Sequence, residues 1–150
     1  MEHDLSIWYK TTTEKILAWR EFRLNAVNMT SDEIIKSTNN WWTFSLWVKK
    51  IIDPYKPETW PTPWQLLEKG EFCRSAIALG QAYTLWLCLP EKEVELWLVN
   101  NFSEKEIHLV TVVDNTIVLN YILGHINKIN ECDFEVLEKY TKDSLNHIKL

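Results

Sequence analysis

The sequence predicts a single α+β domain whose first half is helical and whose second half forms a short antiparallel sheet. Apolar residues recur at helical spacing up to Pro90, and β-branched residues gather in short runs after it. The chain has 150 residues, of which 46% are hydrophobic. A chain of this size buries roughly two-thirds of its unfolded surface in one core. We therefore expect one domain with three parts, which are a helical part (1–52), a proline-rich connector (53–63), and a part containing a helix, the sheet and a C-terminal helix (64–150).

Two amphipathic helices are expected in the first part. Apolar and charged residues follow a helical pattern over 13–27. Thr30 or Ser31 is a suitable N-cap for the second helix, because acidic residues follow in the first turn, where the helix dipole favours them. Asn39-Asn40 is expected to interrupt this helix. The segment 41–48 then resumes with apolar side chains nearly all round, which is typical of a segment that is covered on several sides.

The connector is too rich in proline for a helix or a central strand, because proline lacks an amide donor and restricts the residue before it. Trp60 and Trp64 are expected to pin the connector to the body of the protein. A short helical turn follows and ends at Gly70. The segment 72–87 is rich in alanine and leucine, which predicts a long helix with Cys73 in its first turn.

About three strands are predicted after Pro90. The segment 94–98 has the period-two pattern of a strand. Two β-branched runs, 107–113 and 116–123, flank Asp114-Asn115, residues that tolerate the left-handed backbone of a tight turn, so we expect a β-hairpin. A last helix, capped by Asn130 or Asp133, is predicted from a single apolar stripe. The stripe consists of Phe134, Leu137, Thr141, Leu145 and Ile148.

The composition argues against nucleic-acid, membrane and metal partners. The net charge is −5 and Lys49-Lys50 is the notable basic pair, so the positive surface of a nucleic-acid binder is missing. The apolar runs stop far short of the ~20 residues that span a bilayer. Cys73, Cys88 and Cys132 are an odd number of cysteines without C-x-x-C spacing, which indicates free thiols in a reducing compartment. We expect no cofactor, no structural metal and no secretory signal, and hence a protein that stays in the cytosol where it is made.

The nine tryptophans are the unusual feature of the composition. Tryptophan supplies large, rigid packing area, and it is also enriched at protein-binding surfaces. Trp41, Trp42 and Trp47 form a cluster in the sequence that has two interpretations. It is either part of the core or an anchor for a protein partner.

Several short motifs resemble one known family. They are Trp41-Trp42, Trp60-Pro61-Thr62-Pro63-Trp64, Phe72-Cys73, Ala78-Leu79-Gly80, Tyr83-Thr84-Leu85 and Val118-Leu119-Asn120-Tyr121. Over roughly residues 39–121 the chain resembles small accessory proteins of T4-like tailed phages. The resemblance implies expression in the cytoplasm of an infected bacterium and a host-modifying, anti-defence or virion-associated role. It transfers no catalytic residue, so the first functional hypothesis is an accessory protein that acts by binding another protein.

A second hypothesis starts from the order of three residues. A helix that begins with a cysteine, then a strand with a histidine, then an antiparallel strand with Asn or Asp resembles transglutaminase-like and papain-like enzymes. Here these residues are Cys73, His108 and Asn120, and Gln65 is a candidate oxyanion donor. The chemistry is consistent, because helix N-terminal amides stabilise a thiolate, an imidazole takes the thiol proton, and an amide orients the ring. This resemblance implies a cysteine-dependent hydrolase or acyl transferase.

The hairpin register decides whether this constellation is feasible. If Val113 pairs with Thr116 across a two-residue turn, the side chain of Asn120 points to the face opposite His108. If Val113 instead pairs with Ile117 across a three-residue loop, His108 and Asn120 become diagonal neighbours on one face. The competing interpretation is that Cys73 is an ordinary buried thiol beside small residues, and that the histidine and the asparagine are structural.

Overall fold

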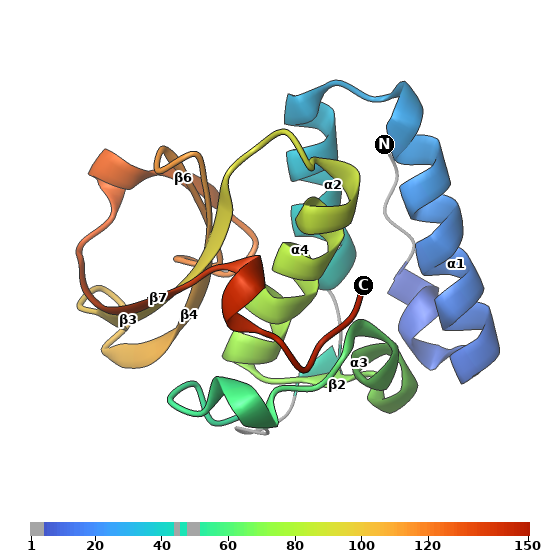
Figure 1. Cartoon of the computed structure of the whole chain (residues 1–150), viewed down its shortest axis with the longest axis horizontal. Helices are drawn as coiled ribbons and strands as arrows, with labels where there is room; N and C mark the ends of the chain where they lie inside the picture. Colours follow the sequence, from blue (N-terminus) through green and yellow to red (C-terminus); the bar gives the residue numbers. More distant parts are fainter. Residues whose placement is uncertain (1–4, 44–45, 48–51) are drawn as a thin grey trace.

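The computed structural model describes residues 5–43, 46–47 and 52–150, and it has the predicted α+β architecture. Figure 1 shows the helices on one side of the molecule and a strongly curved sheet on the other. The four α-helices of the described residues are α1 (Thr12–Asn25), α2 (Ser31–Thr43), α3 (Pro63–Lys69) and α4 (Arg74–Cys88). Short 3₁₀ turns lie at Leu5–Tyr9, Ala26–Asn28, Pro57–Thr59, Ile129–Glu131 and Lys142–Ser144.

The strands of the described residues form two sheets. The larger one has five strands in the order β6-β5-β4-β3-β7, and each strand is antiparallel to its neighbours. Its strands are β3 (Val94–Asn101), β4 (Glu106–Val113), β5 (Ile117–Leu119), β6 (Ile126–Lys128) and β7 (Phe134–Tyr140). A small parallel pair joins β1 (Leu46–Trp47) to β2 (Glu71–Phe72), directly before α4.

Local sequence signals fix the ends of α3. The Thr62 side chain accepts a hydrogen bond from the amide of Gln65, and the Gln65 side chain accepts one from the amide of Thr62, which together make a capping box. Pro63 occupies the first turn, where its missing amide costs no hydrogen bond. Gly70 ends the helix with a φ of 65°, a conformation that glycine adopts without strain. The predicted end of this helix is therefore confirmed.

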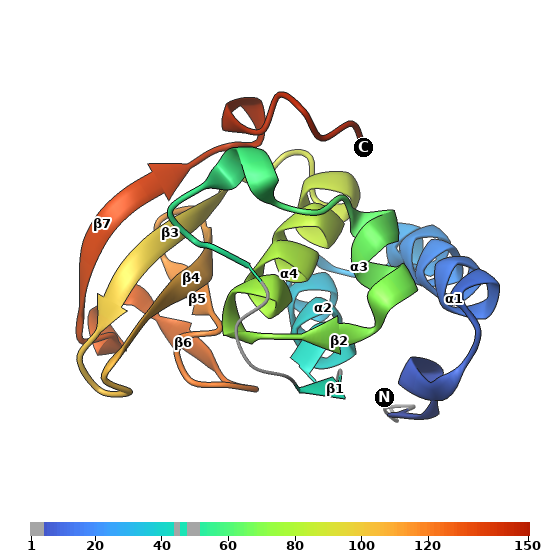
Figure 2. The ribbon, with the colours of Figure 1, turned by 90° about the horizontal axis from the view of Figure 1, so that it is seen from below.

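Helix α4 is the centre of the molecule, lying between α2 and the sheet (Figures 1 and 2). It is buried along almost its whole length, as expected of a helix that is apolar all round. The side chains of Trp19 and Trp42 both donate to the hydroxyl of Thr84 on this helix, at 3.0 and 2.8 Å. None of the helices in the described ranges is both long and apolar enough to cross a membrane.

The two faces of the sheet belong to two separate apolar clusters. Side chains of alternate parity point to opposite faces of a strand. Leu96, Leu98 and Leu109 therefore join the main core with α4, whereas Trp97 and Val110 belong to a second cluster on the other face. Tyr121 belongs to this second cluster, and Phe134 packs against it.

The predicted hairpin is confirmed, with the register that the candidate site requires. Val113 pairs with Ile117, so the loop has three residues, and Asp114 and Asn115 adopt φ values of 51° and 55°. The second strand is shorter than predicted, because pairing ends at Leu119 and Asn120 leaves the strand with a φ of 72°.

Two predicted elements are wrong. Asn39-Asn40 does not interrupt α2, because Asn39 is buried and its side chain donates to the carbonyl of Gly124 at 3.0 Å. The predicted C-terminal helix is instead β7, which pairs with β3 along 134–140. The apolar spacing of this segment is compatible with a helix or a strand. As a strand, the segment pairs with the backbone N–H and C=O groups at the edge of β3, which would stay unpaired if the segment were a helix.

Candidate active site

The first turn of α4 lies where β4 and β5 separate. The last residue pair between these strands is Thr111 with Leu119. Past that pair, the backbone of Leu109 bonds to other parts of the chain, and its amide donates to the hydroxyl of Ser75 on α4 at 3.1 Å. The start of α4 is thus brought against the two segments that carry His108 and Asn120.

Cys73 is the N-cap residue of α4. Its backbone is extended, with φ −94° and ψ 176°, and its carbonyl accepts the hydrogen bond of Ile77 at 3.2 Å. The residue is 5% exposed and contacts the main core. Within the described residues the thiol makes no hydrogen bond, and so none joins it to His108. The cysteine therefore sits at the positive end of the dipole of a long buried helix.

The other two cysteines have a different environment. Both are half-buried, and burial raises the pKa of each thiol to about 11. The charge of Arg23 opposes this effect at Cys88, whereas Glu131 adds to it at Cys132. Both thiols are therefore protonated and weakly nucleophilic at neutral pH.

His108 is 1% exposed, and both nitrogens of its ring are engaged. Nε2 lies 3.2 Å from Nδ2 of Asn101, and Nδ1 lies 2.9 Å from the carbonyl oxygen of Leu109. The Asn101 amide is oriented by two further bonds, since its nitrogen donates to the carbonyl of Tyr121 and its oxygen accepts from the amide of Glu104. Nε2 must therefore accept, and Nδ1 carries the proton.

The ring of His108 is neutral. Burial is the main cause that lowers its pKa to about 4, and the positive charge of Arg74 lowers it further, against the opposing effect of the hydrogen bond to Leu109. A neutral imidazole is the form that accepts a proton from a thiol.

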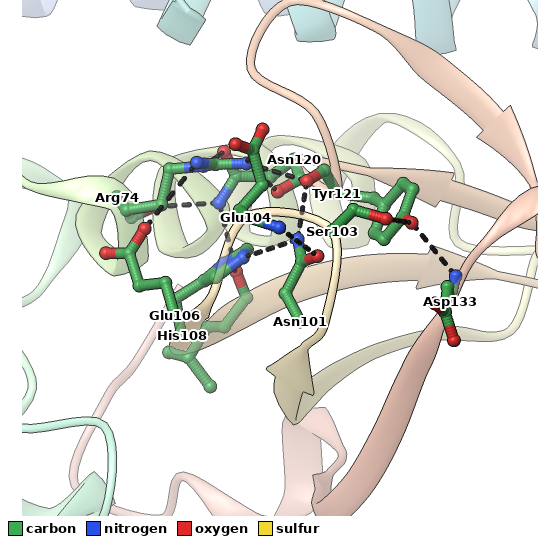
Figure 3. A network of polar contacts seen from close by, with 10 residues as sticks. Arg74, Asn101, Ser103, Glu104, Glu106, His108, Asn120, Tyr121 and Asp133 are labelled. Carbon is green, nitrogen blue, oxygen red and sulfur yellow. Dashed lines mark hydrogen bonds and ion pairs between the residues drawn. The ribbon is translucent and has the colours of Figure 1, made fainter.

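Asn120 meets His108 at one carbonyl group, as Figure 3 shows from close by. Its Nδ2 donates to the carbonyl of Leu109 at 2.9 Å, the same oxygen that His108 contacts, and to the carbonyl of Arg74 at 2.8 Å. The diagonal approach predicted from the register thus brings the two residues together. Their contact runs through the Leu109 oxygen and not through a direct bond between the side chains.

Arg74, which follows the candidate nucleophile, is a site residue that the sequence argument missed. Its Nε donates to Oδ1 of Asn120 at 3.1 Å, and its Nη2 donates to the carbonyls of Asn120 and Tyr121 at 3.0 and 2.7 Å. It also lies 3.9 Å from the carboxylate of Glu104 and 3.7 Å from that of Glu106. The sequence did contain a signal for this residue, because Arg74 is the one charged residue in an otherwise uncharged helix.

Asn101 was also missed, and here the sequence gives little signal. It is fully buried at the end of β3, and its side chain joins His108, Glu104 and Tyr121. An asparagine at a strand end is an ordinary turn-forming residue. Its role depends on the distant Tyr121 carbonyl, which only the folded chain brings near.

Gln65 lies away from these contacts. Its Oε1 accepts from the amide of Thr62 at 2.8 Å, and its side chain is exposed. It lines a cleft of about 610 Å³ together with residues of the connector, α3 and β2. The lining residues are Ile52, Thr59, Pro61, Gln65, Leu66, Glu68, Lys69 and Glu71. In the described part of the chain, no hydrogen bond joins Gln65 to Cys73, so its role as an oxyanion donor stays a prediction.

The tryptophan cluster belongs largely to the core. Trp42 is 0% exposed and its indole packs against α4, so its prediction as an anchor for a partner is wrong for this structure. Trp41 is half-buried, with its ring centroid 5.1 Å from that of Trp8. The side chain of Trp47 lies outside the described residues. Of the two interpretations of the cluster, packing in the core is therefore the one that Trp42 follows.

Comparison with known proteins shows a shared fold. No family model and no curated protein matches the chain. Among solved structures, Legionella pneumophila LapG matches with a TM-score of 0.75 and 14% identity, over 87% of this chain and 76% of LapG. The calcium-bound form of LapG gives 0.75 and 14% over 89% and 78%, and the EGTA-treated form gives 0.73 and 14% over 87% and 74%.

Proposed function

We propose that this chain is a cysteine-dependent hydrolase or acyl transferase with Cys73 as its nucleophile. One observation carries the proposal, namely that the helix beginning at Cys73 is bonded through its first turn to the segments holding His108 and Asn120. The order of these residues is that of transglutaminase-like enzymes. The fold shared with LapG supports this reading over a pure binding role.

The chemistry follows from the protonation state of His108. Its Nε2 is the unprotonated nitrogen of the ring and accepts from Asn101. In this scheme it exchanges that hydrogen bond for the proton of the Cys73 thiol. The thiolate then attacks the carbonyl carbon of an acyl donor, forming a C–S bond, and the leaving group departs with the proton from His108. Water or an acceptor amine, deprotonated by the same nitrogen, attacks the thioester, which releases the acyl group and restores the thiol.

Asn120 is the positioning residue of this scheme. Asn120 donates a hydrogen bond to the Leu109 carbonyl, which also accepts Nδ1–H of His108. Asn120 therefore holds in place the carbonyl that keeps the ring proton on Nδ1. It also donates to the carbonyl of Arg74, one residue from the nucleophile. Asn120 thereby positions the backbone next to both the nucleophile and the base.

A chromogenic acyl donor tests the proposal without knowledge of the natural substrate. We expect p-nitrophenyl acetate to give a stoichiometric burst of nitrophenolate, with the acetyl group found on Cys73 by peptide mass spectrometry. Cys73→Ala should abolish the burst, and His108→Gln should slow it by roughly 10²-fold or more. Cys88→Ala is the matched control and should leave the burst unchanged. An acetyl group on Cys88 or Cys132 instead, or a burst that survives in Cys73→Ala, would refute the assignment.

Protein binding is the weaker account of the function. It was predicted from the tryptophan excess, and Trp42 is part of the core while Trp41 is half-buried against Trp8. The resemblance to proteins of T4-like phages, with the host cytoplasm as the location, stays a prediction, since the LapG structures do not test it.

A further inference from the structure

The LapG structures raise the question of calcium, because one is calcium-bound and another is EGTA-treated. Calcium takes six to eight oxygen ligands, usually with several carboxylates among them. In the described residues, no group of three or more His, Cys, Asp or Glu side chains is arranged to hold a metal ion. The two carboxylates beside the candidate site, those of Glu104 and Glu106, already lie within 4 Å of Arg74. The residues of this site therefore do not fit a resident calcium ion.

Arg74 is surrounded by oxygen atoms. Its guanidinium faces oxygen atoms from three places, which are the segment after β5, the loop between β3 and β4, and the first residue of β4 (Figure 3). They are the side-chain and backbone oxygens of Asn120, the backbone oxygen of Tyr121, and the carboxylates of Glu104 and Glu106. Carbonyl, amide and carboxylate oxygens are the groups that a hard cation collects. Here a side chain of the protein supplies the positive charge.

We infer that Arg74 is the fixed cation of this site, which holds the Asn120–Tyr121 segment against the start of α4 so that no divalent ion is needed. Only its importance for catalysis rests on the proposed function. Its structural role follows from the contacts alone.

Two physical features favour this role. The side chain of Arg74 is 8% exposed, and a buried charge persists only where it is paired and hydrogen-bonded, as it is here. The contact is also reciprocal, because Asn120 returns a hydrogen bond to the carbonyl of Arg74. Asn120 has the left-handed φ of 72°, so these bonds hold a backbone conformation that would otherwise relax. Loss of the guanidinium should displace Asn120 from Leu109 and from His108.

The first test uses the unmodified protein. Its thermal midpoint and the ¹⁵N chemical shifts of the Asn120 side chain are measured in calcium chloride and in EGTA. We expect no difference between the two. A midpoint that rises with calcium and falls with EGTA would overturn the inference, whether or not the protein has any enzymatic activity.

The second test uses variants at Arg74. Arg74→Met keeps an apolar chain but removes the charge and the donors, whereas Arg74→Lys keeps the charge without the planar fork. We expect the thermal midpoint to fall in Arg74→Lys and to fall further in Arg74→Met. Lys92→Met is the matched control, since it breaks an exposed pair with Asp114 at 3.3 Å and should change the midpoint little.

A histidine titration separates positioning from general stability. The charge of Arg74 lowers the pKa of His108, so the pKa of His108 measured by NMR should rise in Arg74→Met and stay low in Arg74→Lys and Lys92→Met. An unchanged titration in a folded Arg74→Met protein would overturn the inference. If Arg74→Met does not fold, the thermal midpoint of Arg74→Lys is the deciding measurement. An unchanged midpoint in Arg74→Lys would show that the planar guanidinium does not hold the Asn120–Tyr121 segment in place, and would overturn the inference. Failure of the acylation test would leave all these readouts intact.

Discussion

His108 is held as a neutral imidazole by partners that make further hydrogen bonds of their own. Asn101 can present only its amino group to Nε2, because its oxygen is bound to the amide of Glu104. The Leu109 carbonyl takes the other ring proton. Protonation of the ring would put two donors face to face at Asn101 inside the protein, which is costly in a buried site. The arrangement therefore favours a base over a preformed thiolate–imidazolium pair.

The buried histidine makes a definite contribution to the pH dependence of stability. Its pKa is lowered from 6.5 to about 4 in the folded state, so the unfolded chain binds a proton that the folded chain does not. The folded state is favoured most above pH 6.5, and about 3 kcal/mol of unfolding free energy is lost as the pH falls towards 4.

We expect His108→Gln to remove this component. Denaturant unfolding at pH 7 and pH 4.5 should give a smaller acid-induced loss for the variant than for the unmodified protein. His125→Gln, at an exposed position, is the control and should keep the full loss. An equal loss in His108→Gln would mean that this histidine is protonated in the fold.

At the scale of elements, the close approach of α2 and α4 depends on Gly80. A Cβ atom at this position would overlap the six-membered ring of Trp42. The Trp42 indole also donates to Thr84, one turn further along α4, so the ring cannot easily move away. The helix tolerates glycine here because the packing gain exceeds its backbone cost of ~1 kcal/mol relative to alanine.

We expect Gly80→Ala to destabilise the protein by roughly 1–3 kcal/mol, because overpacking outweighs the better helix propensity of alanine. Denaturant unfolding of a double-mutant cycle with Trp42→Leu checks the cause. In the Trp42→Leu background, where the ring is gone, Gly80→Ala should cost much less. Equal costs in both backgrounds would show that the ring is not the obstacle.

The elements also show what a sequence can and cannot predict. The left-handed tolerance of Asp114 and Asn115 is a local property, and it was enough to predict the hairpin. Strand parity defined two possible registers, and only the structure shows that Val113 pairs with Ile117, the register that relates His108 to Asn120. The segment 134–140 fits a helix or a strand equally well by its apolar spacing. Its structure depends on the edge of β3, some 35 residues earlier, and no local pattern reports that edge.

At the scale of the whole molecule, the candidate site lies where the main core meets the second apolar cluster. Cys73 and Leu109 belong to the main core, and Tyr121 belongs to the second cluster. The cysteine, the histidine and the asparagine could be predicted from their order along the chain. Asn101 could not, and the lone charge of Arg74 in α4 marked that residue without revealing its partners. The carbonyl oxygens of Asn120 and Tyr121 that these two side chains contact approach only after α4 has packed on the sheet.

The proposed function depends on the reactivity of Cys73 in the folded protein. This reactivity is measured most directly by the rate of alkylation with iodoacetamide as a function of pH, with each modified cysteine identified by mass spectrometry and Cys73→Ala as the control. We predict that Cys73 is alkylated first in the native protein at neutral pH, well ahead of Cys88 and Cys132, whose pKa values of about 11 keep them protonated. The rate should fall in His108→Gln. If Cys73 reacts only after denaturant unfolds the chain, it is a core cysteine and the proposed enzyme does not exist.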